Sequence, residues 1–185
     1  MEFLKLLEER RAYRSLDPVT INESLINELA DAVKLAPSCY NNQPWRFLFI
    51  YEKNILEKTF TALSEGNAWA KKSSMIVAVL SQKDLDCIMP DGRTYYKFDT
   101  GMATGILILK ATELGLVAHP IAGYNPEIIK TVFNIPGSME VLTLVIIGKK
   151  SKEISSELND YQIKTEKNRP QRKENKDFIY INEYK

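Results

Sequence analysis

Two short basic motifs stand near opposite ends of the chain, and both are suited to hold an anion. Their arginines are Arg10, Arg11 and Arg14 in "ERRAYRSL" and Arg169 and Arg172 in "RPQRK". Guanidinium groups bind phosphate oxygens in bidentate fashion, so the two motifs together could form a phosphate clamp. Arginines at a helix end also complement the helix dipole, and a basic run is often a solvated surface, so the local pattern leaves both interpretations open. The clamp requires a fold that brings the motifs together.

A polar loop offers a second kind of contact. The stretch "APSCYNNQPWRF" at 36–47 leaves a helical run and enters an apolar one through Trp45. Its hydroxyl and amide groups, on Ser38, Asn41 and Gln43, both donate and accept hydrogen bonds. Ser and Asn are also common turn residues, so an ordinary helix-to-strand connection stays open.

The stretch "AHPIAGYNP" at 118–126 places Gly123 at the end of a predicted strand. Strand ends in sheets flanked by helices are frequent ligand sites. A tight turn between strand and helix explains the same residues, and on local grounds it is the simpler interpretation.

The hydrophobic pattern predicts the elements that position these motifs. Helices are expected over the first eleven residues, at 54–63, at 99–114, and from Asn125-Pro126 onward. A further helix is expected to begin at a capping box formed by Thr20 and Glu23 and to end at Ala36. Strands are expected at 45–51, 75–80, 116–121, 141–148 and 178–182. The continuous apolar run at 75–80 favours a strand covered on both faces. Gly101 and Gly105, one turn apart, would let another backbone or a flat ligand approach the long helix.

The C-terminal part of the chain differs from the rest. Residues 149–176 are charged and lack clear periodicity, yet they lead to the strand expected at 178–182. A polar segment of this length is long for an internal loop. We therefore expect one domain over 1–185, with a core over 1–148 and an arm over 149–185 that adds its strand to a second subunit, which implies a homodimer.

Composition excludes several classes of function. A net charge of +1 gives no overall attraction to nucleic acid, although 149–176 holds nine Lys or Arg against five Asp or Glu. No apolar run is long enough to span a bilayer, and no signal peptide is evident, so we expect no membrane partner and a reducing cytoplasm. Cys39 and Cys87 form neither a disulfide framework nor a metal-ligand set, and His119 is the one histidine, so no metal is expected.

Taken in order, the motifs resemble the nitroreductase family of FMN-dependent oxidoreductases. The resemblance covers nearly the whole chain and rests on "ERRAYRSLDP", "LAPSCYNNQPWRF", Asp99 at the head of a Gly/Ala-rich helix, "ELGLVAHPIAGYNPE", "VLTLVIIGKK" and "RPQRK". It implies an α+β nitroreductase-like fold with a mixed, mainly antiparallel central sheet flanked by helices. It also implies a homodimer with arms that complete the partner's sheet, and two FMN sites at the interface.

The resemblance further implies which residues bind FMN. The phosphate and ribityl side would be held by Arg10, Arg11, Ala12 and Arg14 and by Arg172 with Lys173 or Arg169. The loop approaching the flavin from the other subunit would be Pro37, Ser38, Asn41 and Gln43. The ring edge would meet the backbone of Ala122 and Gly123, and Asn67. Ala12 stands where the family often has Ser, which removes one phosphate contact, and the short 81–98 stretch suggests an open pocket.

In this interpretation no catalytic acid, base or nucleophile is needed, because flavin N5 carries the chemistry. Hydride from NADH or NADPH would pass through the flavin to nitroaromatic or quinone-like acceptors in a ping-pong sequence, with Arg14 as the cation near the N1/O2 side of the ring. Two alternatives remain open: another flavin reaction on the same fold, such as reductive dehalogenation, and a flavin-binding or storage protein without useful turnover.

Overall fold

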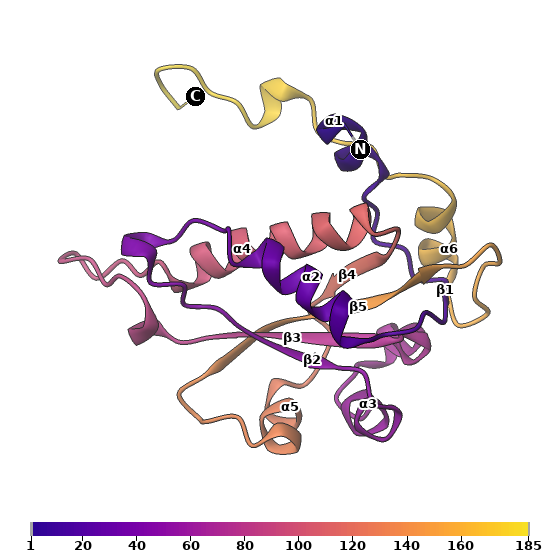
Figure 1. Ribbon diagram of the computed structural model, residues 1–185. Helices are drawn as coiled ribbons and strands as arrows, with labels where there is room; N and C mark the ends of the chain where they lie inside the picture. The colour runs from indigo at the N-terminus through magenta and orange to yellow at the C-terminus, as the bar shows by residue number, and fades with distance from the viewer. Residues whose placement is uncertain (1, 185) are drawn as a thin grey trace.

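The chain forms an α+β structure in which an antiparallel sheet lies between two layers of helices (Figure 1). The computed structural model describes residues 2–184. The strands are β1 (Leu16–Asp17), β2 (Arg46–Ile50), β3 (Met75–Ser81), β4 (Val117–Ile121) and β5 (Glu140–Lys150). β3 lies between β2 and β5, β4 pairs along β5, and β1 pairs with the last two residues of β5. All these pairings are antiparallel, and the expected α+β class is confirmed.

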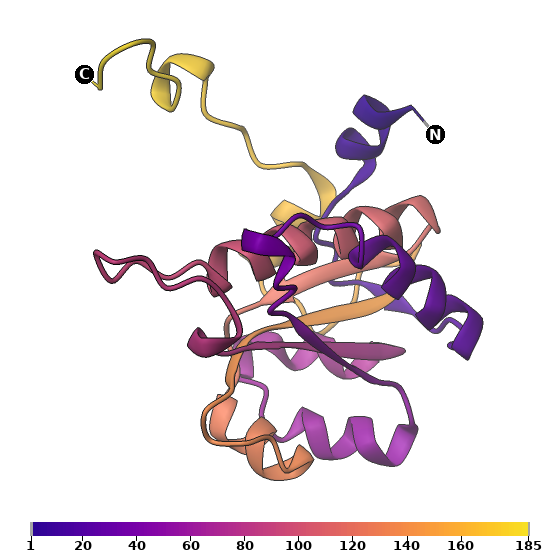
Figure 2. The ribbon, with the colours of Figure 1, turned by 60° about the vertical axis from the view of Figure 1, so that its left-hand side comes forward.

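Helices cover both faces of the sheet (Figures 1 and 2). The helices are α1 (Phe3–Glu9), α2 (Glu23–Val33), α3 (Lys53–Phe60), α4 (Tyr96–Glu113), α5 (Pro126–Phe133) and α6 (Asp160–Lys167). Short 3₁₀ segments are η1 (Cys39–Asn41), η2 (Glu65–Lys72), η3 (Lys83–Leu85) and η4 (Asn175–Asp177). α2 and α4 cover one face, and α3 and α5 the other.

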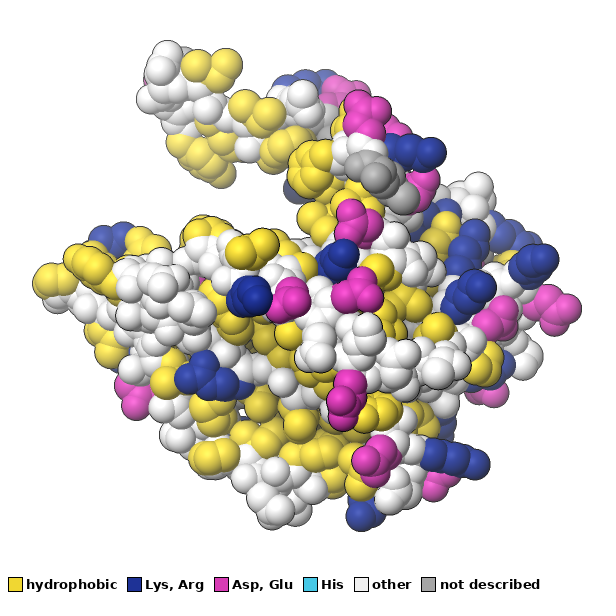
Figure 3. All heavy atoms as spheres, in the orientation of Figure 1, with side chains coloured by type: hydrophobic (Ala, Val, Ile, Leu, Met, Phe, Trp, Pro, Cys, Tyr) yellow, Lys and Arg dark blue, Asp and Glu magenta, His cyan; other side chains and the backbone are white. Residues whose placement is uncertain are grey.

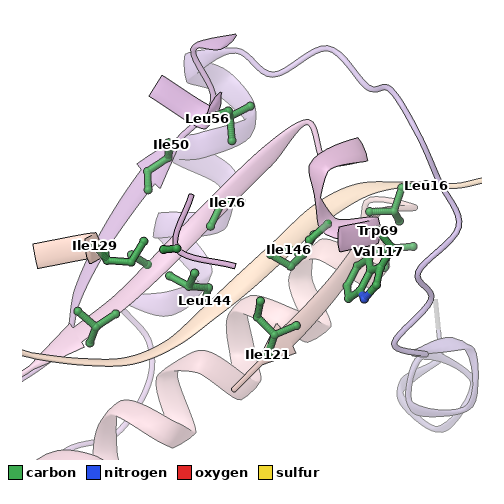
Figure 4. Close-up of a cluster of buried hydrophobic side chains, with 14 of the residues drawn as sticks. Leu16, Ile50, Leu56, Trp69, Ile76, Val117, Ile121, Ile129, Leu144 and Ile146 are labelled. Atoms are coloured by element: carbon green, nitrogen blue, oxygen red, sulfur yellow. The ribbon is translucent and has the colours of Figure 1, made fainter. Parts of the chain in front are cut away.

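The sequence of β3 explains this layering. Successive side chains in a strand point to opposite faces, and all seven residues of β3 are buried. Met75, Val77 and Val79 pack with Leu29 of α2 and Leu107 of α4 in one cluster. The intervening residues of β3 join a second cluster with α3 and α5, in which Figure 4 shows Ile76 with Ile50, Leu56, Ile129 and Leu144. The prediction of a strand covered on both faces is confirmed.

The N-terminal helices differ from the prediction at their ends. The N-cap of α2 is Asn22, whose side chain accepts from Leu25 N at 2.9 Å, and not Thr20. The chain before it is held in place because Val19 N donates to Ser74 Oγ at 2.8 Å. α1 ends at Glu9, and Arg10 already has extended backbone, so the helix predicted over the first eleven residues stops short of Arg10 and Arg11.

The segment after β5 is partly folded onto the body. α6 was not expected, and it begins with a capping box in which Asn159 and Gln162 bond each other's backbone. Leu158, Gln162 and Glu166 are buried. The core boundary predicted at 148 therefore lies too early, because residues of α6 belong to the body.

Beyond Asn168 the chain leaves the body, close to α1 (Figures 1 and 2). The strand expected at 178–182 is not formed within the single chain, where this segment is a turn and bend. A strand requires an edge to pair with, and the segment pairs with none in the described chain. Its large side chains are exposed, Phe178 at 56% and Ile181 at 78%, and Figure 3 shows hydrophobic side chains gathered along the arm. No described helix is both long and apolar enough to cross a bilayer.

Candidate functional site

A basic pocket forms where the two arginine motifs meet. Its volume is about 190 Å³, and its lining residues are Arg10, Arg11, Ala12, Arg14, Tyr161, Thr165, Arg169, Pro170 and Arg172. The fold brings the motifs together because α6 turns the chain back over the N-terminal segment. Five arginines and no acidic side chain line the pocket, so its surface is suited to an anion.

The arginines of the pocket fall into two groups by their bonds. Arg11 Nη2 donates to the carbonyls of Thr165 at 2.7 Å and Glu166 at 3.1 Å, at the end of α6. Arg169 Nη2 donates to the carbonyls of Arg10, at 2.9 Å, and Glu8. These two guanidinium groups tie the arm to the N-terminal segment.

Arg10 and Arg172 have guanidinium groups that form no ion pair or hydrogen bond with the described part of the chain. Burial lowers the pKa of Arg10, and the charges of Arg169, Arg172 and Arg11 lower it further. Because an anion would relieve this crowding of like charges, Arg10 and Arg172 are the pocket residues best placed to bind one.

The main chain of Arg14 is held by a buried carboxylate. Glu166 accepts from Arg14 N at 3.0 Å and from Ser15 N at 2.9 Å. The Arg14 guanidinium bonds Thr165 Oγ1 at 3.3 Å and lies over the Trp69 ring, 5.9 Å from its centroid. The Arg14 side chain is thus aimed from the basic pocket toward Trp69.

Trp69 links the pocket to the end of β4. Trp69 Nε1 donates to Asn67 Oδ1 at 3.2 Å, and Asn67 Nδ2 donates to the carbonyl of Gly123 at 2.9 Å. Ser64 Oγ donates to the same carbonyl at 2.8 Å. A Cβ at Gly123 would lie within 2.6 Å of Asn67 Nδ2 and closer still to Ser64, so glycine permits this contact. No described acceptor is bonded to the backbone N–H of Ala122 or Gly123.

His119 packs against Trp69 in this region. Its ring stacks on Trp69 with centroids 4.7 Å apart, and its Nδ1–H donates to the Tyr13 carbonyl at 3.1 Å. Burial lowers the pKa of His119 to about 4, even though the bond to Tyr13 opposes the shift. A neutral ring at ordinary pH adds no charge beside Arg14.

The polar loop at 37–43 lies elsewhere. It follows α2 and sits near the N-terminal end of α4, at the left of Figure 1, whereas α6 lies at the right. Pro37 and Ser38 line a separate pocket of about 450 Å³ with residues of α4. Ser38 Oγ accepts from Gln43 N at 3.0 Å, and Gln43 Nε2 donates to the Asn41 carbonyl at 3.2 Å. Within one chain, these residues are not brought to the basic pocket.

Tyr40, Asn41 and Gln43 all have positive φ, of 48°, 59° and 49°. Left-handed backbone at residues other than glycine is strained, and such strain gathers at binding sites. The shape of this loop is therefore unusual for a simple connection.

Two of the three groups of predicted FMN-binding residues therefore each come together in the structure, and they lie next to each other. Arg10, Arg11, Ala12, Arg14, Arg169 and Arg172 share one pocket, and Asn67, Ala122 and Gly123 share the neighbouring strand end. Lys173 is exposed and outside the pocket lining. Three lining residues were missed, Tyr161, Thr165 and Pro170. The capping pair Asn159 and Gln162 was the signal that could have revealed the helix that carries the first two.

A disulfide was also missed. Cys39 and Cys87, separated by 48 residues in sequence, are joined by an S–S bond. With Asp86 they are the one group of three candidate metal ligands among the described residues, but in this form the two sulfurs are bonded to each other and cannot act as thiolate ligands.

Comparison with known proteins agrees with the fold. The family model described as "Nitroreductase family" matches residues 7–149. A protein of Bacillus subtilis provisionally named NAD(P)H nitroreductase MhqN is 23% identical, covering 82% of this chain and 90% of that protein. A Stenotrophomonas maltophilia protein provisionally named NADH dehydrogenase/NAD(P)H nitroreductase is 30% identical, covering 68% of this chain and 73% of its own length.

Solved structures of related proteins have the same fold. A nitroreductase family protein from Clostridium difficile 630 superposes with a TM-score of 0.81 at 26% identity, over 100% of both chains. A solved oxidoreductase containing FMN superposes with a TM-score of 0.85 at 28% identity, over 97% of this chain and 91% of that one. The fold and the arginine pocket therefore define an α+β protein with a basic pocket whose charge is suited to an anion. The chain belongs to the nitroreductase family.

Proposed function

We propose that this protein is an FMN-dependent oxidoreductase that transfers hydride from NADH or NADPH to nitroaromatic or quinone-like acceptors. The single observation that carries the proposal is the pocket of five arginines without an acidic side chain, in a chain of this family. Its two unpaired guanidinium groups fit the charge of a phosphate monoester. The solved relative that contains FMN supports the choice of cofactor.

The residues present fit both the phosphate end and the ring end of FMN. Arg10 and Arg172 would bind the phosphate, with Arg11 and Arg169 holding the walls of the pocket in place. The free backbone N–H groups of Ala122 and Gly123 would donate to the ring edge, and Asn67 keeps that backbone in position. Bound flavin supplies the redox chemistry itself, accepting hydride from the nicotinamide and passing it to the second substrate.

The chain's own contribution to the reaction is position and charge. Arg14 would place a cation beside the ring, and the hydrogen bond that its backbone N–H donates to Glu166 holds it there. His119, whose pKa is lowered by burial, remains neutral and so does not compete for that role. Because nicotinamide and acceptor would use the same open face in turn, we expect ping-pong kinetics.

A homodimer with shared sites is the second part of the proposal. The loop holding Ser38 and Asn41 is far from the basic pocket of its own chain, so it would meet the pocket of a partner (Figure 1). Gly101 and Gly105 of α4 face open space, where a Cβ would meet nothing within 4 Å. We propose that the partner covers this helix and receives the exposed apolar arm at 178–182 as an added strand.

Flavin uptake and reduction test the proposal. The purified protein should bind one FMN per chain, and anaerobic NADH or NADPH should bleach the flavin absorbance, which a quinone then restores. Protein that takes up no FMN contradicts the proposal. Protein that binds FMN but is not bleached by either nucleotide supports the storage alternative, and turnover with a halogenated aromatic in preference to quinones supports dehalogenation. We also propose that the protein is located in the cytoplasm.

A further inference from the structure

The Cys39–Cys87 disulfide ties the 37–43 loop to the segment that precedes α4. Three weaker contacts also hold the loop: Cys39 N donates to Asp99 Oδ2 of α4 at 2.6 Å, and Asn42 Nδ2 donates to Asp86 Oδ1 at 3.3 Å and to Cys87 Sγ at 3.5 Å. The disulfide is the only covalent one of these contacts. Its reduction would leave the loop held by hydrogen bonds alone.

The two sulfur atoms have different surroundings. Cys39 lines the open pocket of about 450 Å³, whereas Cys87 is absent from that lining. Cys87 Sγ accepts a hydrogen bond from Asn42 Nδ2 at 3.5 Å. Both cysteines are half-buried, so the pocket is what distinguishes them. A dithiol that enters the pocket meets Cys39, which favours attack at Cys39 and departure of Cys87.

A buried carboxyl group stands beside the disulfide. An Asp86 oxygen lies within 4.8 Å of both Sγ atoms, and Asp86 Oδ2 has no partner among the described residues.

We propose that Cys39–Cys87 is an exchanging disulfide, a second redox group that a dithiol reduces through Cys39. A thiolate of the dithiol attacks Cys39 Sγ, the S–S bond breaks, and the electron pair leaves with Cys87 Sγ, which takes a proton from solvent. The second thiolate of the dithiol then attacks the mixed disulfide and releases Cys39, which also takes a proton from solvent. The protein gains two electrons and two protons, and the dithiol is oxidised to its disulfide and gives its two protons to solvent.

Reduction has a consequence for the loop. Ser38, Asn41 and Gln43 lie in the segment that the disulfide holds, so reduction should increase its mobility. A lower affinity for FMN should follow. That last step rests on the proposed function, whereas the exchange does not.

Dithiothreitol added to the folded, FMN-free full chain tests the exchange. Alkylation and mass measurement should show both thiols released while the circular dichroism of the fold is unchanged. Hydrogen exchange should become faster at 37–43 and stay constant in β3. A disulfide that opens only when the chain unfolds, or unchanged exchange at 37–43 after reduction, overturns the proposal.

Variants test the assigned roles of the sulfurs. With an aromatic disulfide as probe, Cys87→Ser should react through Cys39 at least about tenfold faster than Cys39→Ser reacts through Cys87, because Cys39 borders the pocket. Equal or reversed rates for the two single-cysteine variants contradict attack at Cys39. Since these measurements need no flavin, their failure is separate from a failure to bind FMN.

Discussion

Arg10 and Arg11 are adjacent in sequence, yet the structure gives them opposite roles, and one pair of substitutions can separate these roles. The Arg10 guanidinium has no bonded partner among residues 2–184 and is crowded by like charges, whereas the Arg11 guanidinium bonds two carbonyls of α6. We consider Arg10→Gln and Arg11→Gln, which remove the charge but keep an amide donor. Arg93→Gln is the matched control, because Arg93 is exposed and pairs only with Asp91 in a surface loop.

The expected magnitudes follow from these contacts. Loss of a charge-assisted hydrogen bond to phosphate costs about 1.5–3 kcal/mol, so Arg10→Gln should raise the Kd for FMN by about 10- to 150-fold. Without FMN, the same change removes repulsion and should leave the free energy of unfolding unchanged or slightly higher. Arg11→Gln breaks bonds at 2.7 and 3.1 Å from a charged donor. It should lower the free energy of unfolding by about 1.5–3 kcal/mol.

Two assays measure the two effects. Quenching of FMN fluorescence gives Kd, and urea unfolding of FMN-free protein gives stability. The Arg10→Gln effect on Kd should also shrink in high salt, because screening weakens the contact of a half-exposed charge. Tight FMN binding by Arg10→Gln, or a stability loss in Arg10→Gln that exceeds that in Arg11→Gln, refutes the assignment of roles.

Three further predictions concern assembly and stability. Removing residues 168–185 should turn the dimer into a monomer in sedimentation, and a truncated chain that stays dimeric contradicts the role of the arm. Gly123→Ala should lower the free energy of unfolding by about 1–3 kcal/mol through overlap with Asn67, while Gly66→Ala, with open space at its Cβ position, should not; equal effects would sink this reasoning. Because the folded pKa of His119 is lowered from 6.5 to about 4, its contribution is present above 6.5 and is lost as pH falls, by up to about 3 kcal/mol near pH 4. His119→Asn should flatten this part of the stability profile in urea unfolding, and identical profiles contradict it.

The parts of the fold that could be predicted are those with strong local signals. β3 is a continuous apolar run, and the Asn125 side chain caps α5 by accepting from Glu127 N and Ile128 N, as its place before Pro126 predicts. The start of α2 was predicted at Thr20, although "TINE" holds a second side chain able to cap a helix, that of Asn22. Tertiary contacts decide between them, because Val19 is bonded to Ser74 and the helix begins after Asn22.

The parts that were missed depend on contacts between distant segments. α6 has a highly charged sequence and is held by Arg11 and by the bond from Gln162 Nε2 to the Gly66 carbonyl, at 2.9 Å. The pairing of Cys39 with Cys87 spans 48 residues, and no local pattern reports it. The basic pocket was predicted in part. Its arginines were identified from the sequence, but the hydrogen bonds of Arg11 and Arg169 were needed to show which arginines can bind an anion.

The central claim is that each FMN site is shared, with the basic pocket of one chain and the 37–43 loop of the other. A mixed dimer tests it most directly: one protomer carries Arg10→Ala and Arg172→Ala, and the other, with a different tag, carries Ser38→Ala and Asn41→Ala. Each parent homodimer should bind FMN weakly. If sites are shared, the mixed dimer has one fully intact site and should bind one FMN per dimer with the affinity of the unmodified protein. If each chain holds a complete site, both sites of the mixed dimer are damaged, and the absence of any high-affinity FMN contradicts the account.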